Sequence, residues 1–198
     1  MNGAVLQMVN HGVSTGALFL LVGYLYERTH TRDLAAYGGL AKVTPALAGV
    51  FVVVTLSSIG LPGTNGFIGE FLILLGTFVA PMGSWSVFGE QVSKGVALSV
   101  IAATGVILGA VYMLWLVQRV YFGPMRKAAT HGLPDLTLRE WLCVAPLLCA
   151  IVVIGAYPAP FLAASQIPAS DLIARVRPRV VTPLRPQGAQ LLPRGGGR

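Results

Sequence analysis

One stretch determines how this chain folds: Ser57-Ser58-Ile59-Gly60-Leu61-Pro62-Gly63-Thr64-Asn65-Gly66-Phe67-Ile68-Gly69-Glu70-Phe71. Apolar runs at 46–56 and 71–79 flank a proline, four glycines, an asparagine and one carboxylate. Pro62 removes a backbone donor and collides with the preceding helical turn, and glycine is a poor helix former. In a soluble protein this pattern would indicate a loop. In a chain this hydrophobic it predicts a membrane helix that is broken near its middle.

The composition indicates an integral membrane protein. Hydrophobic residues make up 55% of the 198 positions, charged residues make up only 11%, and the mean hydropathy is +0.72. Ordinary soluble domains are about 25% charged. The chain is long enough for about four crossings of ~20 residues each. We therefore expect a multi-pass protein of the cell inner (plasma) membrane, embedded in the lipid bilayer.

Hydrophobic patterning divides the chain into four membrane segments, at about 4–26, 45–79, 94–117 and 141–156. A continuous helix over the second segment would be about 50 Å long. That exceeds the ~30 Å hydrocarbon core but is short for two crossings. We therefore expect an all-α membrane protein with about four transmembrane helices, the second being two half-helices broken near Pro62. The expected domains are a transmembrane domain at 1–163 and a poorly ordered Pro/Arg/Gly-rich tail at 164–198.

Basic residues concentrate in two connections and in the tail. The connections at 27–44 and 123–140 are more basic than the loop at 80–93, so positive-inside counting places both in the cytoplasm. The net charge of +7 arises largely from six tail arginines: Arg175, Arg177, Arg179, Arg185, Arg194 and Arg198. Since no aromatic residues are interleaved with them, contact with lipid headgroups or partner subunits is favoured over nucleic-acid binding.

The first segment has a polar stripe on one helical face. Gln7, His11, Ser14 and Thr15 are spaced at i, i+4, i+7 and i+8. His11 could relay protons, since its ordinary pKa near 6.5 is easily moved, or could bridge helices by hydrogen bonds. Gln7, Ser14 and Thr15 could order water beside it or bond to neighbouring helices. We expect this stripe to face protein or water, and favour helix-to-helix bonding for the three supporting residues.

Glu70 is the principal candidate site residue. A carboxylate within the bilayer is costly and by default marks an ion or proton site, and an apolar environment disfavours its charged form. The residues that break the helix, Pro62, Gly63 and Gly66, would leave free backbone groups beside it. The alternative is a structural carboxylate that bonds to the unwound backbone. We favour the proton-site interpretation.

The remaining candidates point away from redox or metal chemistry. His30 lies in a charged cluster and could mark proton entry, although a solvated interface cluster is the simpler interpretation. Cys143 and Cys149 are not spaced as metal ligands, and the histidines lack convergent carboxylates. We find no glycine-rich phosphate loop, flavin motif or iron–sulfur cysteine set, so no cofactor is expected in this chain.

Several longer motifs resemble one family. They are Asn10-His11-Gly12, Leu25-Tyr26-Glu27-Arg28-Thr29-His30-Thr31-Arg32-Asp33, Tyr37-Gly38-Gly39-Leu40, the 61–71 part of the break, Arg119-Val120-Tyr121-Phe122-Gly123 and Leu138-Arg139-Glu140. Together they span about 2–163 and resemble the antiporter-like subunit family of the proton-pumping NADH:quinone oxidoreductase (respiratory complex I). The resemblance is to the C-terminal part of its chain M (chain 4).

The resemblance implies roles that composition cannot show. Glu70 matches the ionisable residue in the broken helix of a half-channel, and His11 matches a histidine on the proton route. A full family subunit has about fourteen crossings, so this chain is expected to be a truncated, split or partial version. NADH, flavin, iron–sulfur clusters and quinone would be bound by partner subunits, alongside sibling antiporter-like subunits. The alternatives are a multisubunit cation/proton antiporter or membrane-bound hydrogenase subunit, or a truncated structural membrane subunit without transport.

Overall fold

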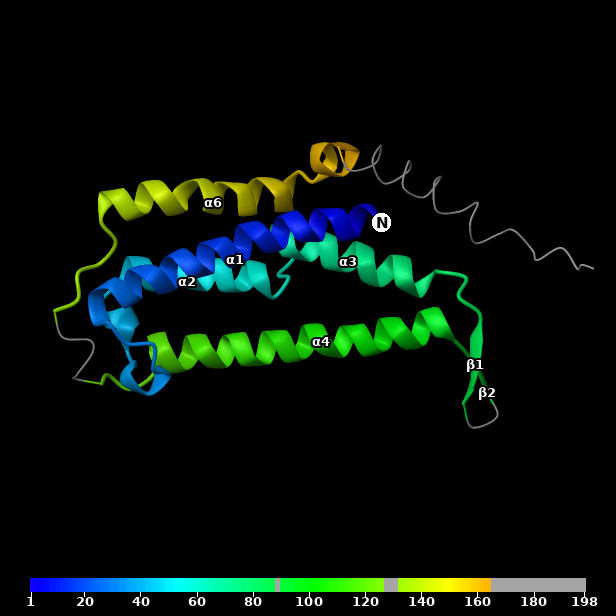
Figure 1. The fold of residues 1–198 in the computed structure, drawn as a ribbon, viewed down its shortest axis with the longest axis horizontal. Coiled ribbons are helices and arrows are strands. Elements are labelled where there is room, and N and C mark those ends of the chain that lie inside the picture. Colours follow the sequence, from blue (N-terminus) through cyan, green and yellow to red (C-terminus); the bar gives the residue numbers. More distant parts are fainter. Residues whose placement is uncertain (88–89, 127–131, 165–198) are drawn as a thin grey trace, which may run out of the picture.

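The chain folds into a bundle of long helices, with the N-terminus at one end (Figure 1). The computed structural model describes residues 1–87, 90–126 and 132–164. The elements in chain order are α1 (Asn2–Thr29), η1 (Leu34–Ala36), η2 (Leu40–Lys42), α2 (Pro45–Ser58), α3 (Asn65–Phe78), β1 (Ser84–Val87), β2 (Glu90–Ser93), α4 (Lys94–Val117), η3 (Gln118–Phe122) and α6 (Leu138–Ala156). Residues 159–164 are also helical. Helices α2 and α3 follow one another along α1, with α6 on one side and α4 on the other (Figure 1).

The helix lengths confirm an all-α membrane fold whose second crossing is broken. Among the described residues three helices are long and apolar enough to cross a membrane, namely α1, α4 with η3, and α6. Helices α2 and α3 have 14 residues each, or about 21 Å. Neither alone reaches across the ~30 Å core, so the two together make one crossing.

The break lies at Pro62, as predicted. Helix α2 ends at Ser58, where the Ile59 N–H still reaches the Thr55 carbonyl. Gly60 and Gly63 then have positive φ angles of 74° and 93°, which glycine adopts without steric cost. Gly66, which we also expected in the break, instead lies in the first turn of α3. A Cβ there would collide with the Ser57 carbonyl oxygen, so Gly66 allows the two half-helices to pack closely.

Apolar side chains fill the centre of the bundle. The most buried include Leu21, Leu47, Val54, Tyr121 and Ile151, which come from α1, α2, η3 and α6. The outer face of α4 instead exposes Ile101, Ile107 and Leu108. An exposed aliphatic face is what a lipid-facing helix requires, because lipid tails are as apolar as leucine.

Three details differ from the sequence prediction. Helix α1 is longer at both ends than 4–26, and α4 continues through the π-helical turn η3 to Phe122. The loop expected at 80–93 contains a two-stranded antiparallel hairpin that pairs Ser84 with Ser93 and Val87 with Glu90. In β1 the two serines alternate with a tryptophan and a valine, which is the strand signal. The expected lack of order in the 164–198 tail lies outside the described residues from 165 onward.

The two basic connections meet at one end of the bundle. The Arg126 guanidinium donates to the Ala35 carbonyl at 2.8 Å, and the Asp135 carboxylate accepts from the backbone N–H of Ala46 at 2.8 Å. The two connections therefore lie at the same end of the bundle, as the prediction of a shared side of the membrane requires. That this side is the cytoplasm stays a prediction.

Candidate functional site

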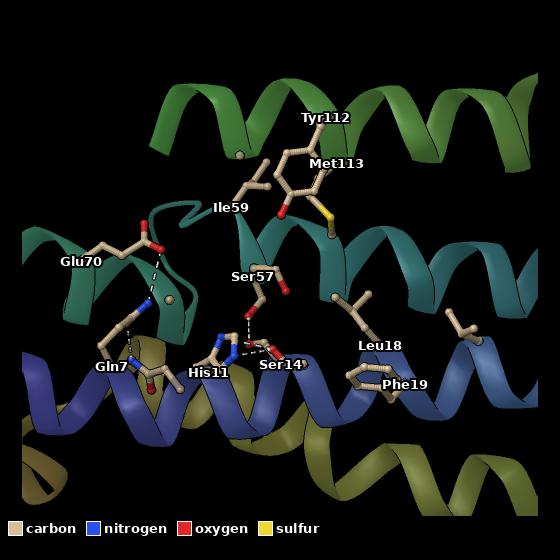
Figure 2. Close-up of a pocket in the computed structure, with 16 residues that line it drawn as sticks. Gln7, His11, Ser14, Leu18, Phe19, Ser57, Ile59, Glu70, Tyr112 and Met113 are labelled. Carbon is tan, nitrogen blue, oxygen red and sulfur yellow. Dashed lines mark hydrogen bonds between the residues drawn. The ribbon is translucent and has the colours of Figure 1, made fainter. Parts of the chain in front are cut away.

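Glu70 lies in the second turn of α3, just after the break in the crossing. Its half-buried side chain extends toward α1, where the Gln7 side-chain amide donates to Glu70 Oε1 at 3.2 Å (Figure 2). The acid of α3 is thus hydrogen-bonded to a side chain of the polar stripe predicted on α1.

A line of amides continues from Gln7 to the start of α3. Asn10 Nδ2 donates to Gln7 Oε1 at 3.4 Å and to the Asn65 carbonyl oxygen at 2.6 Å. Asn65 is the first residue of α3. Two side chains therefore connect the Glu70 carboxylate to the backbone at the helix break.

Asn65 also organises a buried cluster between the half-helices and α1. Its side-chain oxygen accepts from the Ser57 and Ser14 hydroxyls, and its amide nitrogen donates to the Asn10 carbonyl at 3.3 Å. The Ser14 and Ser57 hydroxyl oxygens lie 2.8 Å apart. All four side chains are buried, and buried polar groups stabilise a packed structure only when they are hydrogen-bonded. The cluster therefore joins the end of α2, the start of α3 and the middle of α1.

A cavity of about 440 Å³ lies beside this cluster, between α1, the break, α3 and α4. Tyr112 and Met113 project into it from α4 (Figure 2). Two buried oxygens of its lining residues, Asn10 Oδ1 and Ser58 Oγ, have no hydrogen-bond partner among the described residues. The cavity brings together the predicted polar residues of both helices: Gln7, His11, Ser14, Thr15 and Glu70.

The two predicted histidines occupy different environments. His11 is exposed but lines the cavity, and its ring nitrogens are 3.2 and 3.4 Å from the Thr15 hydroxyl. His30 is exposed and forms the left-handed C-cap of α1, with its ring edge-on to Tyr26. The separation of 19 positions between them corresponds to about 28 Å along the helix. The structure therefore does not bring His30 to the cavity, and its place in a proton path stays a prediction.

Sequence reasoning identified six of the cavity residues, including Gly66 of the break, but missed the residues that connect them. Asn10, Ser57 and Asn65 were not selected as site residues, although the cluster depends on them. Asn10 lies three positions after Gln7, and Ser57 and Asn65 flank the break on either side. Polar residues bordering a membrane-helix break would have been the signal. Among the described residues no group of three or more His, Cys, Asp or Glu side chains could hold a metal ion.

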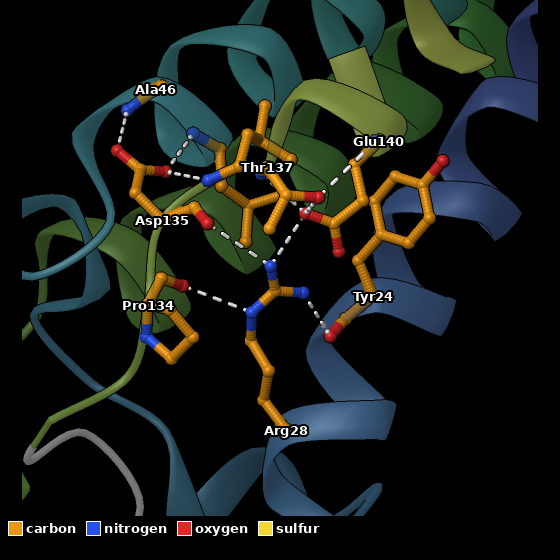
Figure 3. A network of polar contacts seen from close by, with 9 residues as sticks. Tyr24, Arg28, Ala46, Pro134, Asp135, Thr137 and Glu140 are labelled. Carbon is orange, nitrogen blue, oxygen red and sulfur yellow. Dashed lines mark hydrogen bonds and ion pairs between the residues drawn. The ribbon is translucent and has the colours of Figure 1, made fainter. Parts of the chain in front are cut away.

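A second polar network joins α1, α2 and α6 at the end of the bundle where the basic connections meet (Figure 3). The Arg28 guanidinium donates to Glu140 Oε2 at 2.7 Å and to the carbonyls of Tyr24, Pro134 and Asp135 at 2.7 to 3.2 Å. Glu140 also completes a capping box with Thr137 at the start of α6. One arginine thus binds the C-terminal part of α1 to the segment that leads into α6.

Asp135 caps α2 from a distance of almost ninety residues in the sequence. Its carboxylate accepts from the N–H groups of Ala46 and Leu47 at 2.8 and 3.0 Å, while the N-cap residue Thr44 makes no side-chain cap bond. Burial on its own would raise the pKa of Asp135. The N–H donors of Ala46, Leu47 and Leu136 and the nearby Arg28 guanidinium together lower its pKa below the ordinary range.

Asp135→Asn is expected to destabilise the protein by about 1 kcal/mol at pH 7, because the variant keeps the shape but loses the charge at the helix N-terminus. Because the pKa of Asp135 is lower in the folded state than the ordinary aspartate value of about 4, the charged carboxylate stabilises the folded protein above about pH 4. This stabilisation is lost as the pH falls through the folded-state pKa. The difference in Tm between natural protein and variant, measured in detergent from pH 7 downward, should therefore shrink in acid. Asp33→Asn is the control, since Asp33 caps only the short exposed turn η1. A difference that grows in acid would contradict the assignment.

Comparisons with known proteins agree with this membrane fold. The family model described as NADH:quinone oxidoreductase/Mrp antiporter, TM, matches residues 1–93. A relative named NADH-quinone oxidoreductase subunit M, from Rhodobacter capsulatus, is 47% identical over 158 residues, which cover 80% of this chain and 28% of the relative. The chain thus spans less than a third of that relative's length.

Two solved structures are similar in fold. A chain of respiratory complex I from Thermus thermophilus with bound NADH matches with a TM-score of 0.69 and 32% identity, over 83% of this chain and 33% of that chain. A chain of the membrane-bound sulfane sulfur reductase, an archaeal respiratory membrane complex, matches with a TM-score of 0.66 over 97% of this chain and 34% of that chain. At 20% identity the second match shows the fold alone.

The membrane assignment and the family resemblance are both confirmed. The long apolar helices and the family match make the chain a multi-pass protein of the bacterial inner membrane. Its polar residues at the break lie within the region that the family model covers. Over residues 1–93 the chain matches the family model described as NADH:quinone oxidoreductase/Mrp antiporter, TM, and over its matched length it is similar to part of a subunit M.

Proposed function

We propose that this chain supplies part of a proton channel in the membrane arm of a proton-translocating NADH:quinone oxidoreductase. In this proposal Glu70 is the group that binds and releases the proton. The observation that supports it best is the hydrogen bond between Glu70 and Gln7 at the edge of a polar cavity beside a broken membrane helix. Acids at membrane depth are expensive and are found chiefly on ion and proton routes.

The cavity contains the elements that proton transfer requires. A proton moves between groups that are within hydrogen-bonding reach, directly or through water. Glu70 and His11 both line the cavity, and its volume of about 440 Å³ is large enough to hold water. We propose a route from Glu70 through cavity water to His11, with Thr15 orienting the imidazole. His30, at the other end of α1, is the proposed entry point, reached through other groups.

The redox reaction would take place elsewhere. We expect NADH, flavin, iron–sulfur clusters and quinone to be bound by partner subunits, and sibling antiporter-like subunits to contact this one. The identity of 47% to a subunit M favours this assignment over a cation/proton antiporter or hydrogenase subunit. The chain would then be a non-redox subunit of the oxidoreductase, coupled to electron transfer by conformational or electrostatic change.

Labelling with dicyclohexylcarbodiimide tests the proposal. This hydrophobic reagent reacts with protonated carboxyl groups in apolar surroundings. In inner-membrane vesicles with the assembled complex, we expect Glu70 to be labelled and NADH-driven proton uptake to fall in proportion. Mass spectrometry of the labelled peptide identifies the residue.

Two comparisons make the labelling decisive. Glu27 and Glu90 are exposed, outside the cavity, and should remain unlabelled. Replacing external sodium with potassium should leave proton uptake unchanged if protons are the coupled ion, and should change it for a sodium/proton antiporter. Full labelling of Glu70 with undiminished proton uptake would contradict the proposal.

A further inference from the structure

Gly60 lies against the carboxylate of Glu70. It follows the end of α2 with a φ of +74°, and a Cβ built on it would lie 2.5 Å from Glu70 Oε2. Real Cβ atoms essentially never approach another atom so closely. The glutamate oxygen therefore occupies the space that any other side chain at position 60 would fill.

The other oxygen of the same carboxylate is held from α1. Gln7 Nε2 donates to Oε1, and Gln7 itself lies against Gly69, the residue before Glu70. A Cβ on Gly69 would lie 3.0 Å from Gln7 Cβ and 3.1 Å from Gln7 Cα and would collide with the Gln7 side-chain oxygen. The absence of a side chain at 69 thus lets α1 approach closely enough for Gln7 to reach Glu70.

Gly60 differs from Gly63, the other positive-φ glycine of the break, in its contact with Glu70. Gly63 lies in the same break with a φ of +93°, and a Cβ there would meet nothing within 4 Å. Both positions favour glycine because of their positive φ. Only position 60 is also packed against the Glu70 carboxylate. Comparing substitutions at the two glycines therefore separates the effect of backbone strain from the effect of contact with Glu70.

We infer that Gly60 is a positioning residue for Glu70, and that Gly60, Gln7 and Gly69 form a seat that fixes the carboxylate at the cavity. This inference rests on the function proposed for Glu70. A methyl group at position 60 would push the carboxylate into another rotamer, away from Gln7. Since proton transfer depends on hydrogen-bond geometry, the displaced acid would exchange protons poorly even in an assembled complex.

The test compares Gly60→Ala with Gly63→Ala in the assembled complex. Both variants place a Cβ on a positive-φ residue and share that backbone cost. We expect Gly60→Ala to slow NADH-driven proton uptake about tenfold or more, as small misplacements of reacting groups do. Gly63→Ala should remain within about twofold of the natural protein, because nothing lies near its methyl group.

A shorter acid should relieve the collision. In Gly60→Ala/Glu70→Asp the carboxylate is withdrawn by one methylene group, so we expect proton uptake to exceed that of Gly60→Ala alone. The pH of half-maximal carbodiimide labelling of Glu70 supplies a second readout, which should move in Gly60→Ala and not in Gly63→Ala. His11 from α1 and Tyr112 from α4 line the same cavity and are unchanged in both variants.

The outcomes separate this inference from the proposed function. The inference that Gly60 positions Glu70 would be wrong if Gly60→Ala and Gly63→Ala slowed proton uptake equally. It would also be wrong if Glu70→Asp restored no proton uptake to Gly60→Ala. If the complex does not assemble with Gly60→Ala but assembles with Gly60→Ala/Glu70→Asp, the inference is supported. If neither of these variants assembles while Gly63→Ala does, the inference is wrong. Normal proton uptake in Glu70→Gln would instead overturn the proposed function, and the labelling profile would still decide whether Gly60 positions the carboxylate.

Discussion

Glu70→Gln is expected to reduce NADH-driven proton translocation by about tenfold or more, because the amide keeps the shape of the side chain but cannot release a proton at neutral pH. The variant amide can still bond with Gln7, whose side chain has both a donor and an acceptor group. The packing at the helix break should therefore persist. The loss would be one of chemistry rather than of folding.

The measurement is proton uptake by inner-membrane vesicles at a matched rate of NADH oxidation. NADH oxidation by ferricyanide, which does not require proton translocation, reports how much complex has assembled. Glu90→Gln is the matched control, since Glu90 is an exposed glutamate on the hairpin strand β2. Glu70→Asp should give an intermediate rate, because it keeps the ionisable group but shortens its reach. A proton-to-electron ratio unchanged in Glu70→Gln would disprove the proton-site assignment.

Local sequence signals predicted the broken crossing and its acid. Pro62 and the positive-φ glycines prevent a continuous helix by steric and conformational effects that act within a few residues. Composition supplied the membrane context that makes Glu70 unusual. None of these inferences required knowledge of which helices are neighbours, and the break is accordingly observed where it was predicted.

The connectors of the site depend on tertiary packing. Asn10 could have faced lipid, protein or water, and only the approach of α3 to α1 places its amide against the Asn65 carbonyl. Gly60 illustrates the same limit. Its positive φ follows from the turn, whereas its contact with Glu70 follows from how the first turns of α3 pack beside the break.

The charged connections show this limit most clearly. The sequence placed Arg28 and Asp135 only within the two basic connections, at 27–44 and 123–140. In the structure Arg28 reaches residues 106 to 112 positions away, and Asp135 caps a helix that begins ninety residues earlier. Charge patterning identified where the polar ends of the helices lie, but it could not pair groups on separate connections.

Arg28→Ala is expected to be the most destabilising single change at this end of the bundle, by about 3–5 kcal/mol. The Arg28 and Glu140 side chains are only 9% and 12% exposed. Removal of the arginine would leave the Glu140 carboxylate without its counter-ion and would remove the guanidinium donor from three backbone carbonyls. The cost of an uncompensated buried charge exceeds that of losing one surface ion pair.

A double-mutant cycle separates the ion pair from the carbonyl contacts. The thermal midpoint of the purified complex should fall in Arg28→Ala, and Arg28→Ala/Glu140→Gln should recover part of the loss because no unpaired charge remains. Arg28→Lys should be intermediate, since an ammonium cannot reproduce the planar fork that reaches four acceptors. Arg139→Ala is the control, because Arg139 is adjacent to Glu140 but exposed. If Arg28→Ala and Arg139→Ala lowered the midpoint equally, Arg28 would be an ordinary surface arginine rather than the residue that joins α1 to α6.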